Sequence, residues 1–277
     1  MSKPKLPSFD LVVATVDRNE ELGRLLDSLE RQTHRDFRVL VVDQNDDDRL
    51  ADALRGRAID VHRLVAERGL SRARNAALPH LRADVIAFPD DDCVYPDDLL
   101  ERVARGLAAK PSLDGLTGRA IDGNGRSSPS WKRDRALLSR ENLWNRAISF
   151  AIFLRASVVE QVGAFDEQLG LGSGTSWSSG EEIDYLVRAV DAGTRIEYDP
   201  ALVVVHERET HPARAVGARD GASMGYLLRK HGYPLRTVAT MLVRPAGGAL
   251  VALARRDPRR ARFHLSTLRG RLIGYRA

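Results

Sequence analysis

The sequence predicts an α/β fold with a mixed, mostly parallel sheet and flanking helices, followed by a basic helical extension. Short apolar runs alternate with segments of helical period over the first two hundred residues. Several runs end in polar or acidic residues, as strands do at the ligand-binding edge of an open α/β sheet. Beyond residue 207, arginine-rich segments of helical period replace this alternation. We therefore expect two parts, residues 1–207 and residues 208–277.

The first three elements predict a β-α-β unit. Residues 10–15 form an apolar run, residues 20–32 carry leucines at a helical period, and residues 37–42 form a second apolar run. Such a unit implies two parallel strands joined by a right-handed crossover. The first strand is not followed by G-x-G-x-x-G, and the P-loop pattern G-x-x-x-x-G-K-[ST] does not occur in the sequence. Both absences disfavour a dinucleotide-binding or P-loop protein.

Asp43 ends the second predicted strand, at the same sheet edge as Thr15. A carboxylate there can accept hydrogen bonds from ribose hydroxyls or from a base N–H. The alternative is an acid that only shapes a turn, because residues 45–48 are also polar.

A short strand over residues 60–64 precedes a helix for which Ser71 is the expected N-cap. This helix carries Arg72 and Arg74 near its start, where the helix dipole disfavours cations. We therefore expect an anionic partner for the arginines, either the acidic triplet described next or a diphosphate.

The apolar run of residues 85–88 leads into Asp90, Asp91 and Asp92. Three adjacent carboxylates repel one another unless a cation joins them, and Mg²⁺ or Mn²⁺ is the natural candidate because both prefer oxygen ligands. The alternative is a solvated acidic turn before the helix that follows Pro96. Cys93 is the sole cysteine, so no intrachain disulfide can form, and we expect it to be a packing residue.

Further elements are predicted in chain order: helices over 99–107 and 158–163, and strands over 116–120, 149–154 and 196–205. Between them, the polar segment 122–146 contains two tryptophans, Trp131 and Trp144. It predicts either a mobile loop that covers a substrate or a surface loop whose tryptophans pack back on the body.

Residues 169–180 form a Gly/Ser-rich loop, and a helix with Ser179 as its expected N-cap follows. Glu181 and Glu182 in its first turn suit the helix dipole, but a carboxylate after such a loop is also well placed as a general base. His206 ends the last predicted strand, where it is either a metal ligand or a structural histidine.

The extension has a strong charge asymmetry. Residues 208–277 contain 15 Arg/Lys and 3 Asp/Glu, a net charge of +12, whereas the rest of the chain has a net charge of −7. Helices are expected over 220–231, 237–253 (interrupted at 245–248) and 258–272. Basic amphipathic helices can lie on an anionic membrane surface. The alternatives are a merely solvated face or nucleic-acid binding, which the lack of interleaved aromatic residues disfavours.

No apolar run reaches the roughly 18 residues that span a bilayer, and the polar N-terminus lacks a signal-peptide core. We therefore expect a cytoplasmic location, either free or peripheral on the inner face of the cell membrane.

The order of these segments resembles the large family 2 of inverting glycosyltransferases, which have the GT-A fold of nucleotide-diphospho-sugar transferases. The resemblance covers about residues 9–207. It rests on seven short segments that occur in the family's order: Val13–Arg18, Val41–Asp43, Gly69–Asn75, Phe88–Asp92, Val162–Glu167, Gly180–Asp184, and Tyr198–Pro200 with His206.

The resemblance implies a role for each matching residue. Asp90 and Asp92 match the family's DXD motif, in which the last Asp contacts the metal, and His206 would be a further ligand. Glu182 stands where the family usually has the Asp that acts as catalytic base, with Glu181 as the alternative. Asp43-Gln44-Asn45 also departs from the usual Asp-Asp-Gly-Ser pattern. The implied contacts to the donor nucleotide and its diphosphate are Thr15, Asp17, Arg18, Asp43, Arg72, Arg74, Asp90 and Asp91.

The implied activity is metal-dependent transfer of a sugar, with inversion, from a nucleotide-diphospho-sugar to a hydroxyl of a glycan, lipid-linked glycan or small molecule. Cell-envelope polysaccharide synthesis is the expected setting. Two alternatives stay open: a nucleotidyltransferase of related fold, although its Gly-rich signature is missing after the first strand, and a non-catalytic module that binds an anionic lipid or nucleic-acid surface.

Overall fold

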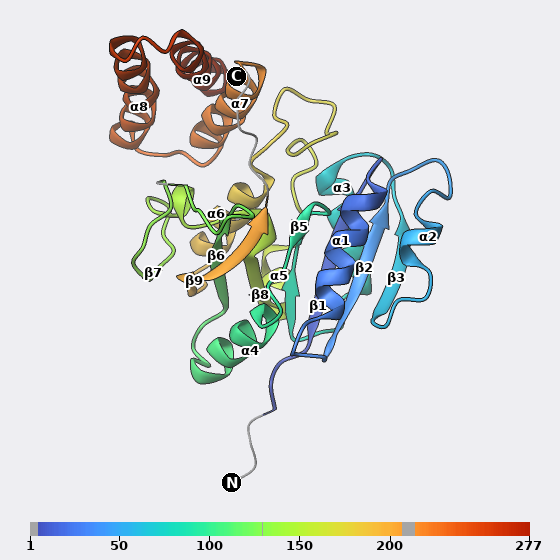
Figure 1. Ribbon diagram of the computed structural model, residues 1–277. Coiled ribbons are helices and arrows are strands. Elements are labelled where there is room, and N and C mark those ends of the chain that lie inside the picture. Colours follow the sequence, from blue (N-terminus) through green and yellow to red (C-terminus); the bar gives the residue numbers. More distant parts are fainter. Residues whose placement is uncertain (1–4, 129, 207–213) are drawn as a thin grey trace. The chain divides into compact units, whose positions relative to one another are not determined.

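A computed structural model of the chain describes residues 5–128, 130–206 and 214–277 (Figure 1). The chain divides into two compact units. The first comprises residues 1–68, 72–165 and 185–208, and the second comprises residues 69–71, 166–184 and 209–277. The expected domain boundary at 207/208 lies outside the described residues.

The first unit is built on a mixed sheet with the strand order β3-β2-β1-β4-β8-β6-β9-β5, and β7 pairs with β9. The first four strands of this order are parallel, and the β-α-β pattern predicted one of these pairings, that of β1 with β2. Beyond β4 the sheet is mixed, because β8 runs antiparallel to both β4 and β6. The strands are β1 (Phe9–Thr15), β2 (Phe37–Asp43), β3 (Asp60–Val65), β4 (Val85–Ala87), β5 (Cys93–Val94), β6 (Gly115–Ile121), β7 (Ala136–Leu137), β8 (Ile152–Arg155) and β9 (Ile196–His206).

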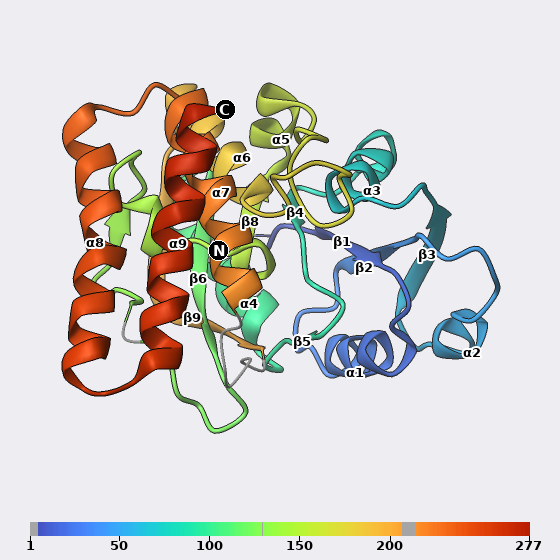
Figure 2. The same cartoon turned by 90° about the horizontal axis from the view of Figure 1, so that it is seen from above.

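Helices cover both faces of this sheet, with α1 and α4 on one face and α3 and α5 on the other (Figure 2). The helices are α1 (Asn19–Glu30), α2 (Ala51–Leu54), α3 (Leu70–Ala77), α4 (Leu99–Ala109), α5 (Ala156–Val162) and α6 (Glu181–Asp191), and single 3₁₀ turns span Leu78–His80, Leu143–Asn145 and Ser149–Ala151. The loop expected over residues 122–146 is thus partly ordered, because β7 and a 3₁₀ turn lie within it.

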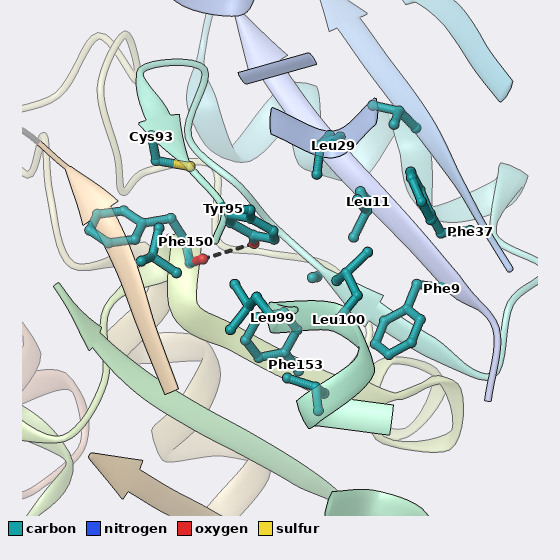
Figure 3. Packing of buried hydrophobic residues seen from close by; sticks show 14 of the residues in the cluster. Phe9, Leu11, Leu29, Phe37, Cys93, Tyr95, Leu99, Leu100, Phe150 and Phe153 are labelled. Carbon is teal, nitrogen blue, oxygen red and sulfur yellow. Dashed lines mark hydrogen bonds between the residues drawn. The ribbon is translucent and has the colours of Figure 1, made fainter. Parts of the chain in front are cut away.

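Alternate residues of β1, β2 and β4 point into the layer beneath α1 and α4, where Leu11 and Phe153 are completely buried (Figure 3). Tyr95 belongs to this core, and its hydroxyl donates to the carbonyl of Phe150 at 2.9 Å, so the buried phenol is satisfied. Cys93 lies in the same core, as expected for a packing residue. The core therefore fixes the segment that follows the acidic triplet.

The second unit contains the helices of the extension: α7 (Arg214–Lys230), α8 (Leu235–Ala254) and α9 (Pro258–Arg276). Helices α7 and α9 pack backbone to backbone through glycines spaced four residues apart, which is a small-xxx-small pattern. A Cβ atom at Gly225 would lie 2.1 Å from the carbonyl oxygen of Arg271, and one at Gly274 would lie 1.9 Å from that of Ala222. The contact therefore requires glycine at these positions.

Helix α8 is continuous, which corrects the expected interruption at residues 245–248. Pro245 cannot donate the helical hydrogen bond to Met241, four residues earlier, and so leaves that carbonyl without its helical partner. The guanidinium of Arg271 on α9 donates to this carbonyl instead. A donor from a neighbouring helix thus compensates for the proline.

Helix α8 is also the one helix in the described part of the chain that is long and apolar enough to cross a membrane. Its most apolar 18-residue window has a mean hydropathy of 1.5, and 28% of that window is buried. Helices of soluble proteins can satisfy the same criteria of length and composition, so this finding does not establish a membrane span.

Candidate active site

The ends of β1, β2 and β4 meet at one edge of the sheet in the first unit. Thr15 and Asp43 are register partners at the ends of β1 and β2, and Asp90 pairs with Ala14 in a parallel bridge just beyond β4. The sequence placed these three polar residues at this edge, and the strand register brings them together there.

Asp43 is completely buried, and its carboxylate already accepts three hydrogen bonds and makes one further contact with a guanidinium nitrogen. Oδ1 accepts from the backbone and side-chain nitrogens of Asn45 at 2.9 and 2.7 Å. Oδ2 accepts from Nε of Arg63 at 2.9 Å, and Nη2 of the same guanidinium lies 2.8 Å from this oxygen. Because a carboxylate offers about four acceptor positions, a ribose or base that binds Asp43 must displace a contact such as that with Arg63.

Asp17 and Arg18 form the turn after β1, and Asp17 has a left-handed backbone with φ of 59°. The backbone N–H of Asp17 donates to Asn45 at 2.8 Å, which ties this turn to the segment after Asp43. The Asp17 carboxylate faces Arg49 at 2.7 Å and Arg68 at 3.4 Å. Asp17 is therefore held by basic residues of its own unit at the edge where the sequence placed it.

Arg18 turns toward the acidic triplet. Its guanidinium lies 2.8 Å from Asp91 Oδ1 and 2.5 Å from Asp92 Oδ2. Although burial favours the neutral form of Arg18, the two carboxylates outweigh it and raise the pKa of the guanidinium. An arginine from the first strand end thus offsets the repulsion within the triplet.

Asp90, Asp92 and His206 form a group of potential metal ligands, and one donor atom from each lies within 4.8 Å of the others. His206 reaches this group because β5 pairs with the end of β9, where Cys93 is its register partner. Its Nε2 lies 3.1 Å from Asp92 Oδ1, and its ring stacks on Phe150 at 4.8 Å. Two carboxylates and an imidazole fit a divalent cation such as Mn²⁺, for which both donor types are suitable.

The last two carboxylates of the triplet, those of Asp91 and Asp92, differ in environment. Burial raises the pKa of Asp91, and hydrogen bonds from Thr15 and Arg18 only partly oppose this rise. Burial acts in the same direction on Asp92, but His206 and Arg18 outweigh it and hold the pKa of that carboxyl below its usual value. Asp92 is therefore kept ionised, as a metal ligand must be.

Arg74 is almost fully buried, and its guanidinium lies 5.7 Å from the ring centroid of Phe88 and 5.4 Å from that of Phe165. One of its nitrogens is 3.5 Å from Asp90 Oδ1, and the hydroxyl of Ser149 lies 3.2 Å from the same oxygen. Of the two partners considered for this arginine, the structure therefore supplies the acidic triplet.

The helix that carries these arginines begins at Leu70, so Ser71 lies within it and is not its N-cap. In the second unit, the hydroxyl of Ser71 donates to the carbonyl of Leu169 at 2.7 Å. In the first unit, Arg72 donates to the carbonyl of Arg68 at 2.9 Å, as a residue of the helix surface does.

In the second unit, helix α6 starts at Glu181 directly after Gly180, so the expected N-cap Ser179 lies one residue too early. Gly180 has a φ of 86°, a conformation that favours glycine. Glu181 is buried with 4% of its surface exposed, whereas Glu182 is partly exposed. The difference in accessibility favours Glu182 over Glu181 as the group that meets a substrate.

Sequence reasoning missed Arg63 beside Asp43, Ser149 beside Asp90, and Phe150 beneath His206. Their contacts depend on strand register and loop path, and none of the three stands in a motif. Asn45 was noticed only as a departure from the family pattern, although its side chain bonds both Asp43 and Asp17.

Comparison with known proteins identifies the family of the chain. The sequence profile of "Glycosyl transferase family 2" matches residues 10–163, more than half of the chain. The chain therefore belongs to this family, and its fold is the GT-A fold.

Two curated relatives carry the same general activity in their names. The chain is 29% identical over 269 residues to a "Pre-mycofactocin glycosyltransferase" of Mycobacterium tuberculosis, which covers 90% of this chain and 53% of that protein. It is 24% identical over 225 residues to "Glycosyltransferase AglE" of Haloferax volcanii, covering 76% and 69% of the two chains. The chain thus spans about half the length of its mycobacterial relative.

Solved structures support the fold. The mannosyltransferase PcManGT from Pyrobaculum calidifontis, in complex with GDP-Man and Mn²⁺, aligns with a TM-score of 0.65 at 17% identity, over 97% of this chain and 88% of that one. S. aureus TarS 1-349, in complex with UDP-GlcNAc, aligns with a TM-score of 0.61 at 17% identity, over 95% and 92%.

Proposed function

We propose that the chain is an inverting, metal-dependent glycosyltransferase that uses a nucleotide-diphospho-sugar donor and an acceptor hydroxyl. The observation that carries this proposal is the group of Asp90, Asp92 and His206, whose donor atoms lie within 4.8 Å of one another at the edge of the sheet. Two structural neighbours were solved with GDP-Man and Mn²⁺ or with UDP-GlcNAc, which supports a donor of this class.

Asp90, Asp92 and His206 would hold the cation, and the imidazole among these donors favours Mn²⁺ over the harder Mg²⁺. When bound, the cation neutralises charge on the leaving nucleoside diphosphate. In the structure, Arg18 and His206 contact the Asp92 carboxylate. A cation bound to Asp92 would replace the contact with Arg18, and Arg18 would then turn toward the donor phosphates, since 45% of its side chain is exposed.

The other candidate contacts to the donor are residues at or near the same edge of the sheet. Asp43 would bind the nucleoside after giving up an Arg63 contact, with Thr15 at the end of β1 and Asp17 in the turn that follows it. Arg74 lies between two aromatic rings and would keep Asp90 oriented. Because it is packed in this way, it would not turn toward the donor as Arg18 would. Arg72 would contact the diphosphate by its positive charge, whereas Asp91 would act on it through Arg18, which lies 2.8 Å away.

Glu182 is our candidate for the catalytic base. It would take the proton of the acceptor hydroxyl, whose oxygen attacks the anomeric carbon from the face opposite the leaving diphosphate. One displacement of this kind inverts the anomeric configuration and needs no protein nucleophile. Glu181 is a poorer candidate because it is buried.

A screen of nucleoside diphosphates by thermal shift, with and without Mn²⁺, tests the donor class, since a ligand that binds only the native state raises the unfolding temperature. We expect one nucleotide to stabilise the protein in a Mn²⁺-dependent manner. NMR of the product formed from the matching sugar donor then reports the anomeric configuration, and retention would refute the single displacement.

We also propose that the extension places the enzyme on an anionic membrane surface, where a lipid-linked glycan would be the acceptor. Helix α8 exposes apolar side chains, and an arginine pair follows its C-terminus at Arg255 and Arg256. Apolar residues beside arginines suit an interfacial helix on anionic lipid. The large apolar side chains that α8 exposes are Leu235 (76%), Val243 (66%), Leu250 (69%), Val251 (51%) and Leu253 (56%).

Flotation of the full chain with vesicles of neutral or anionic phospholipid tests this placement. Binding should require anionic lipid, weaken with salt, and be reduced by the double change Leu250→Glu and Leu253→Glu. Equal flotation of this variant and the wild type would exclude α8 as the contact.

A further inference from the structure

One face of helix α7 contacts the segment that carries the candidate base, and all of these contacts lie within the second unit. The contacting residues recur at i, i+3, i+4, i+7 and i+8, which is the spacing of a single helical face. We call them the α7 clasp: Ser223, Tyr226, Leu227, Lys230 and His231.

The C-terminal end of the α7 clasp binds Asp184, a completely buried residue in the first turn of α6. Asp184 Oδ1 lies 2.6 Å from the Lys230 ammonium and 2.9 Å from Nε2 of His231. Lys230 also contacts Asp166 at 2.6 Å, three residues before the Gly/Ser-rich loop. One lysine therefore ties together both ends of the segment 166–184.

The environment of Lys230 favours its charged ammonium form. Burial favours the neutral amine, but Asp166 and Asp184 outweigh it and raise the pKa of Lys230. Because Lys230 and His231 together offset the burial of the Asp184 carboxylate, loss of the lysine charge would weaken this compensation.

The other clasp residues hold the loop just before α6. Tyr226 stacks on Trp177 with ring centroids 4.8 Å apart, and the hydroxyl of Ser223 accepts from the backbone N–H of Ser179 at 3.2 Å. Leu227 packs against Gly180, where an added Cβ atom would lie 2.7 Å from its side chain. The clasp thus contacts the chain on both sides of Glu182.

This segment needs such support. Four of its glycines, at positions 170, 172, 174 and 180, have positive φ, so the loop has backbone freedom that other residues would restrict. A helix that follows a loop of this kind is expected to fray in its first turn unless side chains hold it. Glu182 lies in that turn.

We propose that the α7 clasp positions Glu182, so that the C-terminal extension is part of the catalytic apparatus through Lys230, His231 and Asp184. This inference rests on the proposed role of Glu182 as base. Lys230 and His231 are positioning residues, since they act on the base through Asp184 and the helix start. Misplacement of a catalytic group by about 1 Å can reduce a rate about 100-fold.

The test compares Lys230→Met with Lys230→Arg in the full-length protein. Lys110→Met is the matched control, because Lys110 makes a partly exposed ion pair with Glu197 in the first unit. Hydrogen–deuterium exchange of peptides covering 176–184 requires no donor. We expect exchange to be at least about 10-fold faster in Lys230→Met, with Lys230→Arg and the control close to the wild type.

The kinetic readout is release of nucleoside diphosphate from GDP-mannose or UDP-N-acetylglucosamine, whichever the wild type turns over. Lys230→Met should lower kcat by about 10- to 100-fold while KM for the donor changes less than about twofold, and Lys230→Arg should recover most of kcat. A general structural defect would instead change kcat and KM together and would not be rescued. If Lys230→Met does not fold, Tyr226→Leu replaces it with the same expectations.

Unchanged exchange over 176–184, or unchanged kcat, would overturn the clasp. Glu182→Gln measured in parallel separates this outcome from failure of the proposed function. Retained turnover in Glu182→Gln would remove its role as base, whereas the exchange result would still report whether α7 holds the segment.

Discussion

Because α7 and α9 pack closely, we expect replacement of glycine by alanine to destabilise the protein at their contact and to stabilise it at an open position of α8. A Cβ atom at Gly274 would lie 1.9 Å from the carbonyl oxygen of Ala222, whereas Cβ atoms are essentially never found within 3.0 Å of such an atom. In Gly274→Ala the two helix backbones must separate by about 1 Å. Gly247 in α8 is the matched control, because a Cβ atom there meets nothing within 4 Å.

Replacing a helical glycine by alanine has two opposing effects on the free energy of unfolding, a cost from overpacking and a gain from helix propensity. Overpacking costs about 1–3 kcal/mol, with the upper end expected where backbone meets backbone, whereas alanine gains about 0.5–1 kcal/mol over glycine within a helix. We therefore expect Gly274→Ala to lower the free energy of unfolding by about 2 kcal/mol and Gly247→Ala to raise it by about 0.5–1 kcal/mol.

Urea unfolding followed by circular dichroism at 222 nm measures both variants against the wild type. At about 2–4 °C per kcal/mol for a protein of this size, the corresponding Tm changes are about −4 to −8 °C and about +1 to +4 °C. If Gly274→Ala equals or exceeds the stability of Gly247→Ala, the helices do not meet through their backbones as described.

Further predictions concern the first unit. Asp10 is buried and bound by Arg38 at 2.6 Å and by two backbone N–H groups, so Asp10→Asn should cost about 3 kcal/mol at pH 7 in urea unfolding. Burial raises the pKa of Asp10, but Arg38 and these N–H groups outweigh it and lower the pKa, so its stabilisation is present above about pH 4 and is lost below that. The difference between Asp10→Asn and wild type should therefore shrink as the pH falls toward 2, and a constant difference would contradict the assignment. Arg74→Met should destabilise the fold and weaken Mn²⁺ binding in calorimetry, because Asp90 loses a buried partner, and unchanged affinity would show that this arginine does not orient the ligand.

The sequence predicted the parallel half of the sheet well because its strands are short apolar runs that end in polar residues. Asp43 and Asp90 were placed at the correct edge for that reason. The longer strands beyond β4 were also predicted as apolar runs, but their pairing directions were not, since pairing direction depends on chain path and not on residue pattern.

Other features could not be foreseen because they depend on residues far away in the sequence. Pro245 predicts an interrupted helix, and only Arg271 on α9 explains why α8 continues. Asp184 is likewise completed by Lys230 and His231, more than forty residues later. The acidic triplet was recognised from its local pattern, but its partner Ser149 was not.

The most direct test of the proposed metal–diphosphate site is calorimetric binding of a nucleoside diphosphate, with Mn²⁺ and without it, to the wild type and to Asp92→Asn. We expect Mn²⁺ to strengthen nucleotide binding to the wild type by at least about tenfold, and Asp92→Asn to remove this gain while the protein remains folded. Nucleotide binding that is equally tight without Mn²⁺, or a full Mn²⁺ effect in Asp92→Asn, would contradict the site.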